Sequence, residues 1–375
     1  MELNLIANKQ DFKNLKEEWN SLLLVSDIKS IFLTWEWQYT WWKNYHGSNE
    51  LCIIIAKMNG KVVGISPTYI GKGIIKCIRF IGDEYVDSNY LNFICDPTCK
   101  KEVIAKFLDT LSKKGMLYLK YVRSDSGMIE SLNAVPGHII KEIKLSICPV
   151  IHLPGSFDDY LNSLSPKLRH NLKRSIKKIS ELEGFNVEKI SSADRALDII
   201  VEINKKKWSK YNSSFDHNFI VFLNEILEIM MESGSCEVFS IKYQDEYKAY
   251  YLNFKYGKEK YYYSASYHID KDDMLNKYSP GLFLLISNIK DAIESKYEMF
   301  DMLRGENDYK LKLKDSDRFN HGYLMMNKKN FISLTYSFFI LTANKFSYVI
   351  ERALPDGLKQ WLKSIIPKKI IGAIR

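Results

Sequence analysis

One short segment, YSPGL at 278–282, has the composition of an anion-binding helix start. Ser279, Pro280 and Gly281 come directly after a predicted strand and open a predicted helix, with Leu282 in its first turn. Serine is favoured at the N-cap, proline at the first helical position, and glycine allows close approach to the backbone. Because free N–H groups and the helix dipole favour negative charge, a pyrophosphate is expected to bind there. A plain helix cap is the alternative for this triplet taken alone.

A second candidate lies further along the chain, in the sequence FDMLRGENDYK. It contains a predicted strand end, a glycine and a predicted helix start. In α/β proteins, ligands often bind where a strand ends and a helix begins. Asp301 and Glu306 could accept a proton from an amine, and Tyr309 could donate one to a leaving thiolate. Arg304 and Lys310 could bind phosphate or pair with the two carboxylates. As an isolated cluster, an internal salt-bridge network fits equally well.

Together the two segments resemble the C-terminal signature of a bacterial GNAT-like family. This family is related to the CelD proteins of cellulose biosynthesis, has a BioF2-like acetyltransferase domain, and is a cousin of the Fem aminoacyl transferases. The resemblance extends upstream to SPKLRHNLKR at 165–174, which looks like the opening helix of that domain, and to Lys207 and Trp208 in the next helix. It covers about 150–327, and residues 1–149 look like a degenerate first half of such tandem proteins.

The resemblance implies an acyl-CoA donor, most simply acetyl-CoA, whose pyrophosphate lies on the helix that starts at Ser279. An amine or hydroxyl acceptor would attack the thioester between the central strands, with no metal and no covalent intermediate. The expected proton-transfer residues are Asp301, Glu306 and Tyr309. The expected donor contacts come from Ser279, Pro280, Gly281 and Leu282. Substrate contacts are expected from Arg304, Lys310, Arg169, His268 and Trp208.

The resemblance leaves more than one identity open for the acyl donor and for the acceptor. The usual phosphate loop of the superfamily has the form Gln/Arg-x-x-Gly-x-Gly/Ala, and only Ser279, Pro280 and Gly281 occupy that corner here. An aminoacyl-tRNA or another acyl carrier is therefore the alternative donor. The acceptor implied by the family is a small sugar, or a lipid-linked or nucleotide-linked precursor of surface polysaccharide. A Fem-like extension of a peptide bridge and a non-catalytic assembly factor at the membrane surface stay open as other functions.

The predicted helix over 165–182 has one apolar stripe and one basic face. Its basic face carries no acid before Glu181. The cations are Lys167, Arg169, Lys173, Arg174, Lys177 and Lys178. Such a face is either simply solvated or binds a phosphate-rich partner: a nucleotide-linked sugar, a tRNA or an anionic lipid.

Histidines and cysteines predict no metal site. His268 could reach the candidate site and His170 lies on the basic helix, but no HExxH pattern or second ligand pair is present, and an ordinary polar role is favoured for each. Cys95 and Cys99 lack a second pair that would complete a zinc site, so the six cysteines are expected to be free thiols in a reducing cytoplasm. The N-terminus has no signal-peptide pattern, which favours a cytoplasmic protein, with peripheral contact at the inner face of the membrane as an extension of that expectation.

The periodicity of the chain predicts the elements that must position these residues. Strands 51–58 and 61–70 form a hairpin on the turn Asn59-Gly60. In the first half, helices are predicted over 10–26, 34–46 and 100–114, and further strands over 76–82, 91–96 and 116–122, followed by one more helix and strand. In the second half, helices are predicted over 165–182, 194–210, 216–232, 279–295 and 307–314, and strands over 236–243, 247–256, 259–266, 298–303 and 318–327.

This order predicts an α/β (α+β) fold with two GNAT-like domains in tandem, each a mixed, largely antiparallel sheet flanked by helices. The expected domains are a degenerate one at 1–149, a catalytic one at 150–330 and a basic amphipathic tail at 331–375. The tail either packs on the first half or contacts a membrane surface. A cluster of tryptophans in the second helix is expected to pack in the core or line a groove, and comprises Trp35, Trp37, Trp41 and Trp42. The net charge of +9 favours phosphate-bearing ligands or an anionic membrane over acidic protein partners.

Overall fold

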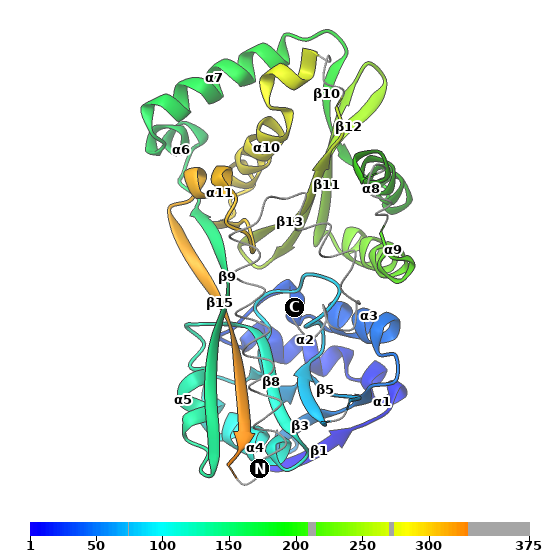
Figure 1. The fold of residues 1–375 in the computed structure, drawn as a ribbon, viewed down its shortest axis with the longest axis vertical. Coiled ribbons are helices and arrows are strands. Elements are labelled where there is room, and N and C mark those ends of the chain that lie inside the picture. The colour runs from blue at the N-terminus through cyan, green and yellow to red at the C-terminus, as the bar shows by residue number, and fades with distance from the viewer. Residues whose placement is uncertain (74, 209–214, 270–273, 329–375) are drawn as a thin grey trace.

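The chain passes through one order of elements twice, as the computed structural model shows for residues 1–73, 75–208, 215–269 and 274–328 (Figure 1). The predicted tail at 331–375 lies outside the described residues. Two helices, Phe157–Ser163 and Pro166–Ser180, open the second half and have no counterpart in the first. From there each half runs from a strand through helices to antiparallel strands, crosses over through a helix to a parallel strand, and closes with a short helix and a long strand. The predicted mixed α/β fold is therefore confirmed, and the element order repeats in space as it does in sequence.

The first half contains five α-helices and nine strands among its described residues. The helices are α1 (Lys9–Asn14), α2 (Lys16–Val25), α3 (Trp35–Tyr45), α4 (Lys100–Ser112) and α5 (Met128–Asn133), with a 3₁₀ turn η1 (Ile31–Leu33) before α3. The strands are β1 (Glu2–Ile6), β2 (Glu50–Leu51), β3 (Ile53–Met58), β4 (Lys61–Ser66), β5 (Thr68–Gly71), β6 (Cys77–Phe80), β7 (Ile94–Cys95), β8 (Met116–Arg123) and β9 (His138–His152).

The second half adds six α-helices and six strands in its described part. The helices are α6 (Phe157–Ser163), α7 (Pro166–Ser180), α8 (Ala193–Trp208), α9 (His217–Glu232), α10 (Pro280–Glu294) and α11 (Asp308–Leu313), with a 3₁₀ turn η3 (Met274–Tyr278) before α10. The strands are β10 (Phe185–Ile190), β11 (Cys236–Tyr243), β12 (Glu246–Tyr256), β13 (Glu259–Tyr267), β14 (Met299–Asp301) and β15 (Ser316–Asn327).

The last strand of each half pairs with the other half. β9 lies antiparallel to β14, and β15 lies antiparallel to β8. β9 and β15 also pair with each other from Ser316↔Val150 to Asn327↔His138, which joins both halves into one sheet of eleven strands in the order β10-β11-β12-β13-β14-β9-β15-β8-β6-β5-β2. In Figure 1 the two long strands cross the middle of the molecule. The boundary expected at 149/150 falls inside β9.

Two sequence predictions of single strands are corrected, and two elements were not predicted. The strand predicted over 61–70 breaks at Pro67 into β4 and β5, which belong to different sheets, because proline has no N–H for the ladder. The strand predicted over 91–96 shrinks to the two residues of β7. α6 and β10 were not predicted, since both are short and only partly apolar.

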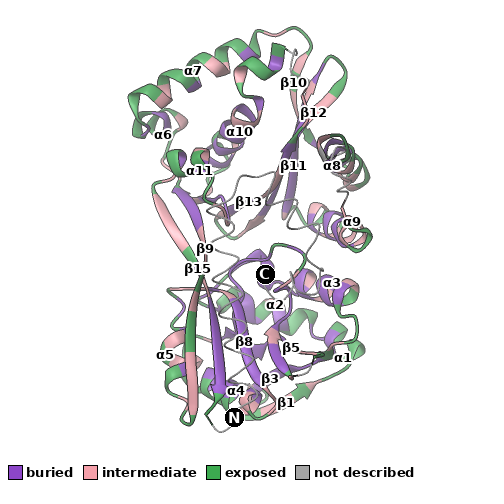
Figure 2. Cartoon of the chain, viewed as in Figure 1, coloured by how far each residue is buried: buried purple, intermediate pink, exposed green. Residues whose placement is uncertain are grey.

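The core continues across the junction of the halves (Figure 2). The Trp37 ring, fully buried, contacts Phe222 and Phe254 of the second half at centroid distances of 5.2 and 5.3 Å. Its indole N–H donates to Ser88 Oγ at 2.9 Å. The other predicted tryptophans, Trp35, Trp41 and Trp42, are buried as well. This cluster therefore packs in the core rather than lining a groove.

A buried charge network anchors α10 on its sheet. The Glu237 carboxylate forms ion pairs with Lys255 at 3.0 Å, with Lys260 at 2.9 Å and also with Lys189. Lys260, fully buried, in turn reaches Asp291 on α10 at 2.6 Å. Burial alone would raise the pKa of Glu237, but the surrounding ammonium groups outweigh it and lower that pKa to about 2.

This network predicts a loss of stability in acid. Because the pKa of Glu237 is lower in the folded state than its ordinary 4.5, its stabilisation is complete above about pH 4.5 and is lost as the pH falls toward 2. In urea titrations, the difference in unfolding free energy between wild type and Glu237→Gln should be large at neutral pH and shrink at pH ~3. The exposed Glu294→Gln serves as control and should show little difference at either pH. A difference for Glu237→Gln that is independent of pH would contradict this role.

Candidate acyl-transfer site

The two central strands of the second half separate beside the start of α10. β13 and β14 run parallel from Glu259↔Met299 to Tyr261↔Asp301, and β13 then continues to Tyr267 paired only with β12. At this point β13 has a bulge: Leu252 faces Ser264 and Asn253 faces Tyr262, which leaves Tyr263 as an extra residue. A bulge disrupts the ladder and is frequent next to active sites. Beyond Tyr261, β13 therefore has no strand partner on its β14 side among the described residues, and we call this place the wedge.

The start of α10 has an unusual backbone conformation. Ser279 lies in the left-handed region, with φ 52° and ψ 62°, and its side chain caps no N–H group of the helix. Ser279 is thus the N-cap residue, as predicted, but its side chain does not cap the helix, because a capping side chain normally requires an extended backbone at this position. Pro280 is buried at the first helical position, as predicted, and Leu282 is half-buried in the first turn. The ring of Tyr267 lies 3.4 Å from the point where a Cβ on Gly281 would stand.

A row of tyrosines connects α10 with α11. The Tyr251 hydroxyl donates to the Gly281 carbonyl oxygen. The rings of Tyr251 and Tyr262 lie 4.8 Å apart, and the Tyr262 hydroxyl interacts with those of both Tyr251 and Tyr309. Burial raises the pKa of Tyr262 well above its ordinary value, and the neighbouring hydroxyls raise it further. The structure thereby brings the two segments predicted from the sequence, around Gly281 and Tyr309, to one place.

Lys310 lies under this row and holds the turn that follows β14. Its ammonium group donates to the carbonyl oxygens of Met302 at 2.7 Å and Arg304 at 3.1 Å. It also lies 5.5 Å from the centre of the Tyr262 ring. Burial lowers the pKa of Lys310 to about 8. This side chain therefore fixes the turn rather than pointing outward as a phosphate ligand.

Asp301 is fully buried at the junction of the halves. Its carboxylate accepts hydrogen bonds from the Tyr90 hydroxyl at 2.7 Å, the Arg318 guanidinium at 3.0 Å and the Leu303 N–H at 2.8 Å. Burial raises the pKa of Asp301, and Arg318 opposes that shift. With three partners and no exposed surface, this carboxylate lies beneath the wedge and ties β14 to the first half.

Arg304 also reaches into the first half. Its guanidinium pairs with Asp87 and lies 4.6 Å from the centre of the Tyr121 ring. Both partners are non-glycine residues with left-handed backbones, at φ 49° and 59°. Leu303, next to Arg304, is a third, at φ 52°. Such strain persists only where surrounding contacts impose it and is common at functional sites.

The other predicted residues lie apart from this cluster or at its edge. Glu306 is exposed on the turn before α11. The Arg169 guanidinium donates to Asn162 at 3.1 Å, within the α6–α7 connection. His268 is half-buried just after β13, and its backbone N–H donates to the Lys248 carbonyl. Trp208 ends α8, and its side chain is not among those described.

Sequence reasoning did not identify several residues that build the site. Tyr251 and Tyr262 belong to the tyrosine-rich strands AYYLNF and YYYSASY, and that enrichment was the available signal. Arg318 and Glu259 form a half-buried ion pair at 2.7 Å, and Arg318 also pairs with the buried Asp301. No sequence signal marks that pair, because its members are far apart along the chain.

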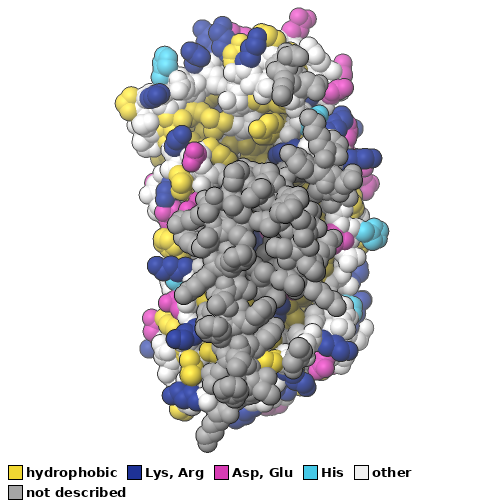
Figure 3. Space-filling view, viewed as in Figure 1, with side chains coloured by type: hydrophobic (Ala, Val, Ile, Leu, Met, Phe, Trp, Pro, Cys, Tyr) yellow, Lys and Arg dark blue, Asp and Glu magenta, His cyan; other side chains and the backbone are white. Residues whose placement is uncertain are grey.

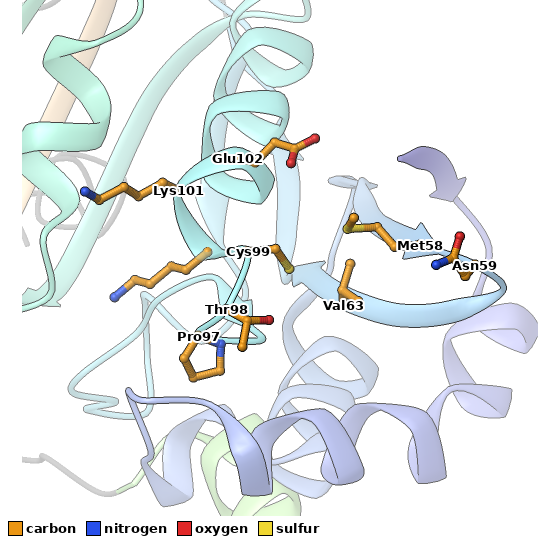
Figure 4. Close-up of a pocket in the computed structure, with 9 residues that line it drawn as sticks. Met58, Asn59, Val63, Pro97, Thr98, Cys99, Lys101 and Glu102 are labelled. Atoms are coloured by element: carbon orange, nitrogen blue, oxygen red, sulfur yellow. The ribbon is translucent and has the colours of Figure 1, made fainter.

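The first half has a pocket at the corner that corresponds to the start of α10 (Figure 4). It lies between the β3–β4 turn and the first turn of α4, and none of the residues predicted for the site lines it. In the described part of the chain, no group of histidine, cysteine or acidic side chains could hold a metal ion, and the cysteines are free thiols. Among the described helices, none has the length and apolar content needed to cross a membrane.

Comparison with known proteins agrees with this architecture. Residues 166–311 match the model of the acetyltransferase (GNAT) domain family. No curated protein matches the chain. Among solved structures, FemX is similar with a TM-score of 0.61 and 14% identity, covering 87% of this chain and 97% of its own.

Two further solved structures share the fold. One is the C-terminal domain of a protein from Agrobacterium fabrum described as a lysylphosphatidylglycerol synthetase, with a TM-score of 0.53, 11% identity and coverage of 88% of this chain and 95% of its own. The other is L-PGS from Bacillus licheniformis, with a TM-score of 0.51, 12% identity and coverage of 85% and 93%. The chain is thus an acyltransferase with a GNAT acetyltransferase domain at residues 166–311, and its two halves together share the fold of FemX.

Proposed function

We propose that the second half transfers an acyl group, most simply acetyl, from acyl-CoA to an amine or hydroxyl of a sugar precursor of surface polysaccharide. The observation that carries the proposal is the wedge between β13 and β14, with the bulge at Tyr263 on one wall and the start of α10 at its mouth. Free N–H groups of α10 suit the donor phosphates. N–H groups at the bulge suit the carbonyl oxygen on which negative charge develops.

The proposed reaction needs one nucleophilic attack and two proton transfers. The acceptor nitrogen or oxygen attacks the thioester carbon, and the tetrahedral intermediate then expels the thiolate as its C–S bond breaks. Tyr309 gives its proton to that thiolate. The proton of the acceptor passes to Glu306, the exposed carboxylate on the turn before α11, three residues ahead of Tyr309. Asp301 and Lys310 position the turn that carries both groups.

A lipid-linked acceptor is favoured within this class by one comparison. The relative from Agrobacterium fabrum is described as a synthetase of lysylphosphatidylglycerol, a lipid. By analogy, the same wedge would serve an acyl transfer to a hydroxyl or amine at the end of a lipid-linked sugar. Similarity to that protein and to FemX equally supports an aminoacyl donor in place of acyl-CoA, which makes the identity of the donor the first point to test.

Calorimetric binding of acetyl-CoA tests the donor. Wild type is expected to bind acetyl-CoA with micromolar affinity, and Gly281→Trp is expected to abolish binding, because Tyr267 already fills the space beside Gly281 and a larger side chain must occupy the helix start. Gly155→Trp is the matched control, since nothing lies within 4 Å of its Cβ position, and it should bind as wild type does.

Two outcomes separate the alternatives. Failure of wild type to bind acetyl-CoA, together with binding of an aminoacyl-tRNA, would replace the CoA donor by the aminoacyl donor. Equal binding by wild type and Gly281→Trp would show that the donor does not use the start of α10.

A further inference from the structure

α7 presents a basic face that the proposed reaction does not use. Leu172 and Ile179 are buried against the rest of the second half, and Leu168 and Ile176 pack beside them. The exposed positions on the opposite side carry no acid. They include Lys167, His170, Lys173, Arg174, Lys177 and Lys178. At 1.5 Å per residue, this face is about 22 Å long.

Most of these cations have no acidic partner within the part of the chain that the structure describes. Lys178 pairs with Glu181 at 3.2 Å, and Arg169 is held by Asn162. For Lys167, Lys173, Arg174 and Lys177, by contrast, neither an ion pair nor a side-chain hydrogen bond is formed with any described residue. Four cations along one helix therefore keep their full charge toward solvent.

The position of α7 suits a flat, extended partner. α7 lies across one end of the long axis of the molecule (Figure 1), and Lys and Arg side chains gather at that end in the space-filling view (Figure 3). The turn η3 lies next to α7, because the Ser175 hydroxyl of α7 donates a hydrogen bond to the Tyr278 carbonyl oxygen at 2.5 Å. η3 exposes Lys277 and one apolar side chain, Met274, which is 44% exposed. η3 thus adds one exposed cation and one exposed apolar side chain next to α7.

We propose that α7 and η3 dock the protein on an anionic lipid surface. Clusters of four to eight Lys and Arg residues on an amphipathic helix attract anionic lipid headgroups, and each cation near the surface contributes separately. RNA fits less well, because α7 contains no phenylalanine, tyrosine or tryptophan on which a base could stack, and His170 is its only aromatic side chain. Docking here does not depend on the identity of the acyl donor. It would place the start of α10, to which η3 leads, close to the lipid surface.

Co-sedimentation of the full chain with lipid vesicles tests the proposal. The vesicles contain phosphatidylglycerol and phosphatidylcholine in equal parts, or phosphatidylcholine alone. The α7 variant replaces its four unpaired cations by glutamine: Lys167→Gln, Lys173→Gln, Arg174→Gln and Lys177→Gln. Its binding to the anionic vesicles should fall at least about tenfold, since each cation contributes and salt screens them only in part.

A matched variant separates local docking from net charge. It removes four exposed cations from the first half, Lys61→Gln, Lys106→Gln, Lys141→Gln and Lys144→Gln, and should bind anionic vesicles nearly as wild type does. The two-site variant Lys173→Gln/Lys177→Gln should show an intermediate loss. Circular dichroism and thermal unfolding check that each variant folds, which their exposed positions favour.

Three results would overturn the docking surface. They are equal binding of wild type to neutral and anionic vesicles, equal losses in the α7 and matched variants, and an α7 variant that keeps vesicle binding while it loses affinity for a tRNA. The last result would assign the basic face to RNA.

Discussion

Tyr309→Phe is expected to slow acyl transfer by about a hundredfold to ten-thousandfold, the range that general acid catalysis supplies. The substitution removes only the hydroxyl that is proposed to protonate the leaving thiolate. The ring stays and keeps its packing in the core of the second half. Because the donor phosphates bind at the start of α10 in this proposal, the affinity for acetyl-CoA should be unchanged.

The measurement is the release of CoA thiol from acetyl-CoA in the presence of an amino-sugar or hydroxyl acceptor found by screening. Tyr39→Phe is the matched control, since Tyr39 is half-buried in the first half and stacks on Trp35 at 4.4 Å. It should retain wild-type activity. Undiminished thiol release by Tyr309→Phe would remove Tyr309 from the reaction. The task of protonating the thiolate would then pass to solvent or another group.

Arg318→Met is expected to destabilise the fold by about 3–5 kcal/mol, the usual cost of leaving a buried charge without its partner. Arg318 donates to Glu259 at 2.7 Å and to Asp301 at 3.0 Å, and its side chain is only 14% exposed. Removal of the guanidinium leaves two carboxylates close together with no cation between them. The loss is measured as the free energy of unfolding in urea at neutral pH.

Two further variants make this result specific. Lys141→Met removes an exposed cation from β9 and should change stability by less than about 0.5 kcal/mol. Adding Asp301→Asn to Arg318→Met removes one of the orphaned charges and should recover part of the loss, as a double-mutant cycle can show. If Arg318→Met were as stable as wild type, Asp301 would not be the tie between the halves that its contacts indicate.

The junction of the halves gives these predictions a common structural basis. Tyr90, in the first half, and Arg318, on β15, both hold Asp301 at the end of β14. Arg304, three residues further on, pairs with Asp87 of the first half. Asp301 and Arg304, which precede Glu306 and Tyr309 in the chain, are thus held by contacts with both halves. A catalytically degenerate first half would still be needed to shape the site of the second.

Local physics made much of this fold predictable from the sequence. The strand period, the Asn59-Gly60 turn and the apolar stripe of α7 each depend on residues near one another in the chain, and the predicted elements lie close to those found. The segments around Gly281 and Tyr309 were identified because proline, glycine and clustered acid, base and phenol groups are local signals. The basic face of α7 was evident for the same reason.

Only the tertiary structure decided how those segments meet. The exchange of β9 and β15 between the halves, and the burial of Asp301 by Tyr90 and Arg318, join residues that are far apart along the chain. The hydrophobic period of the sequence does not predict such pairings, because they depend on which strand edges remain unpaired once both halves have folded. The same holds for the left-handed Ser279, whose residue type predicts an extended cap. Sequence alone therefore determined the elements and the candidate chemistry, whereas long-range packing determined that Asp301 and Lys310 are buried and that Tyr309 lies beside Tyr262.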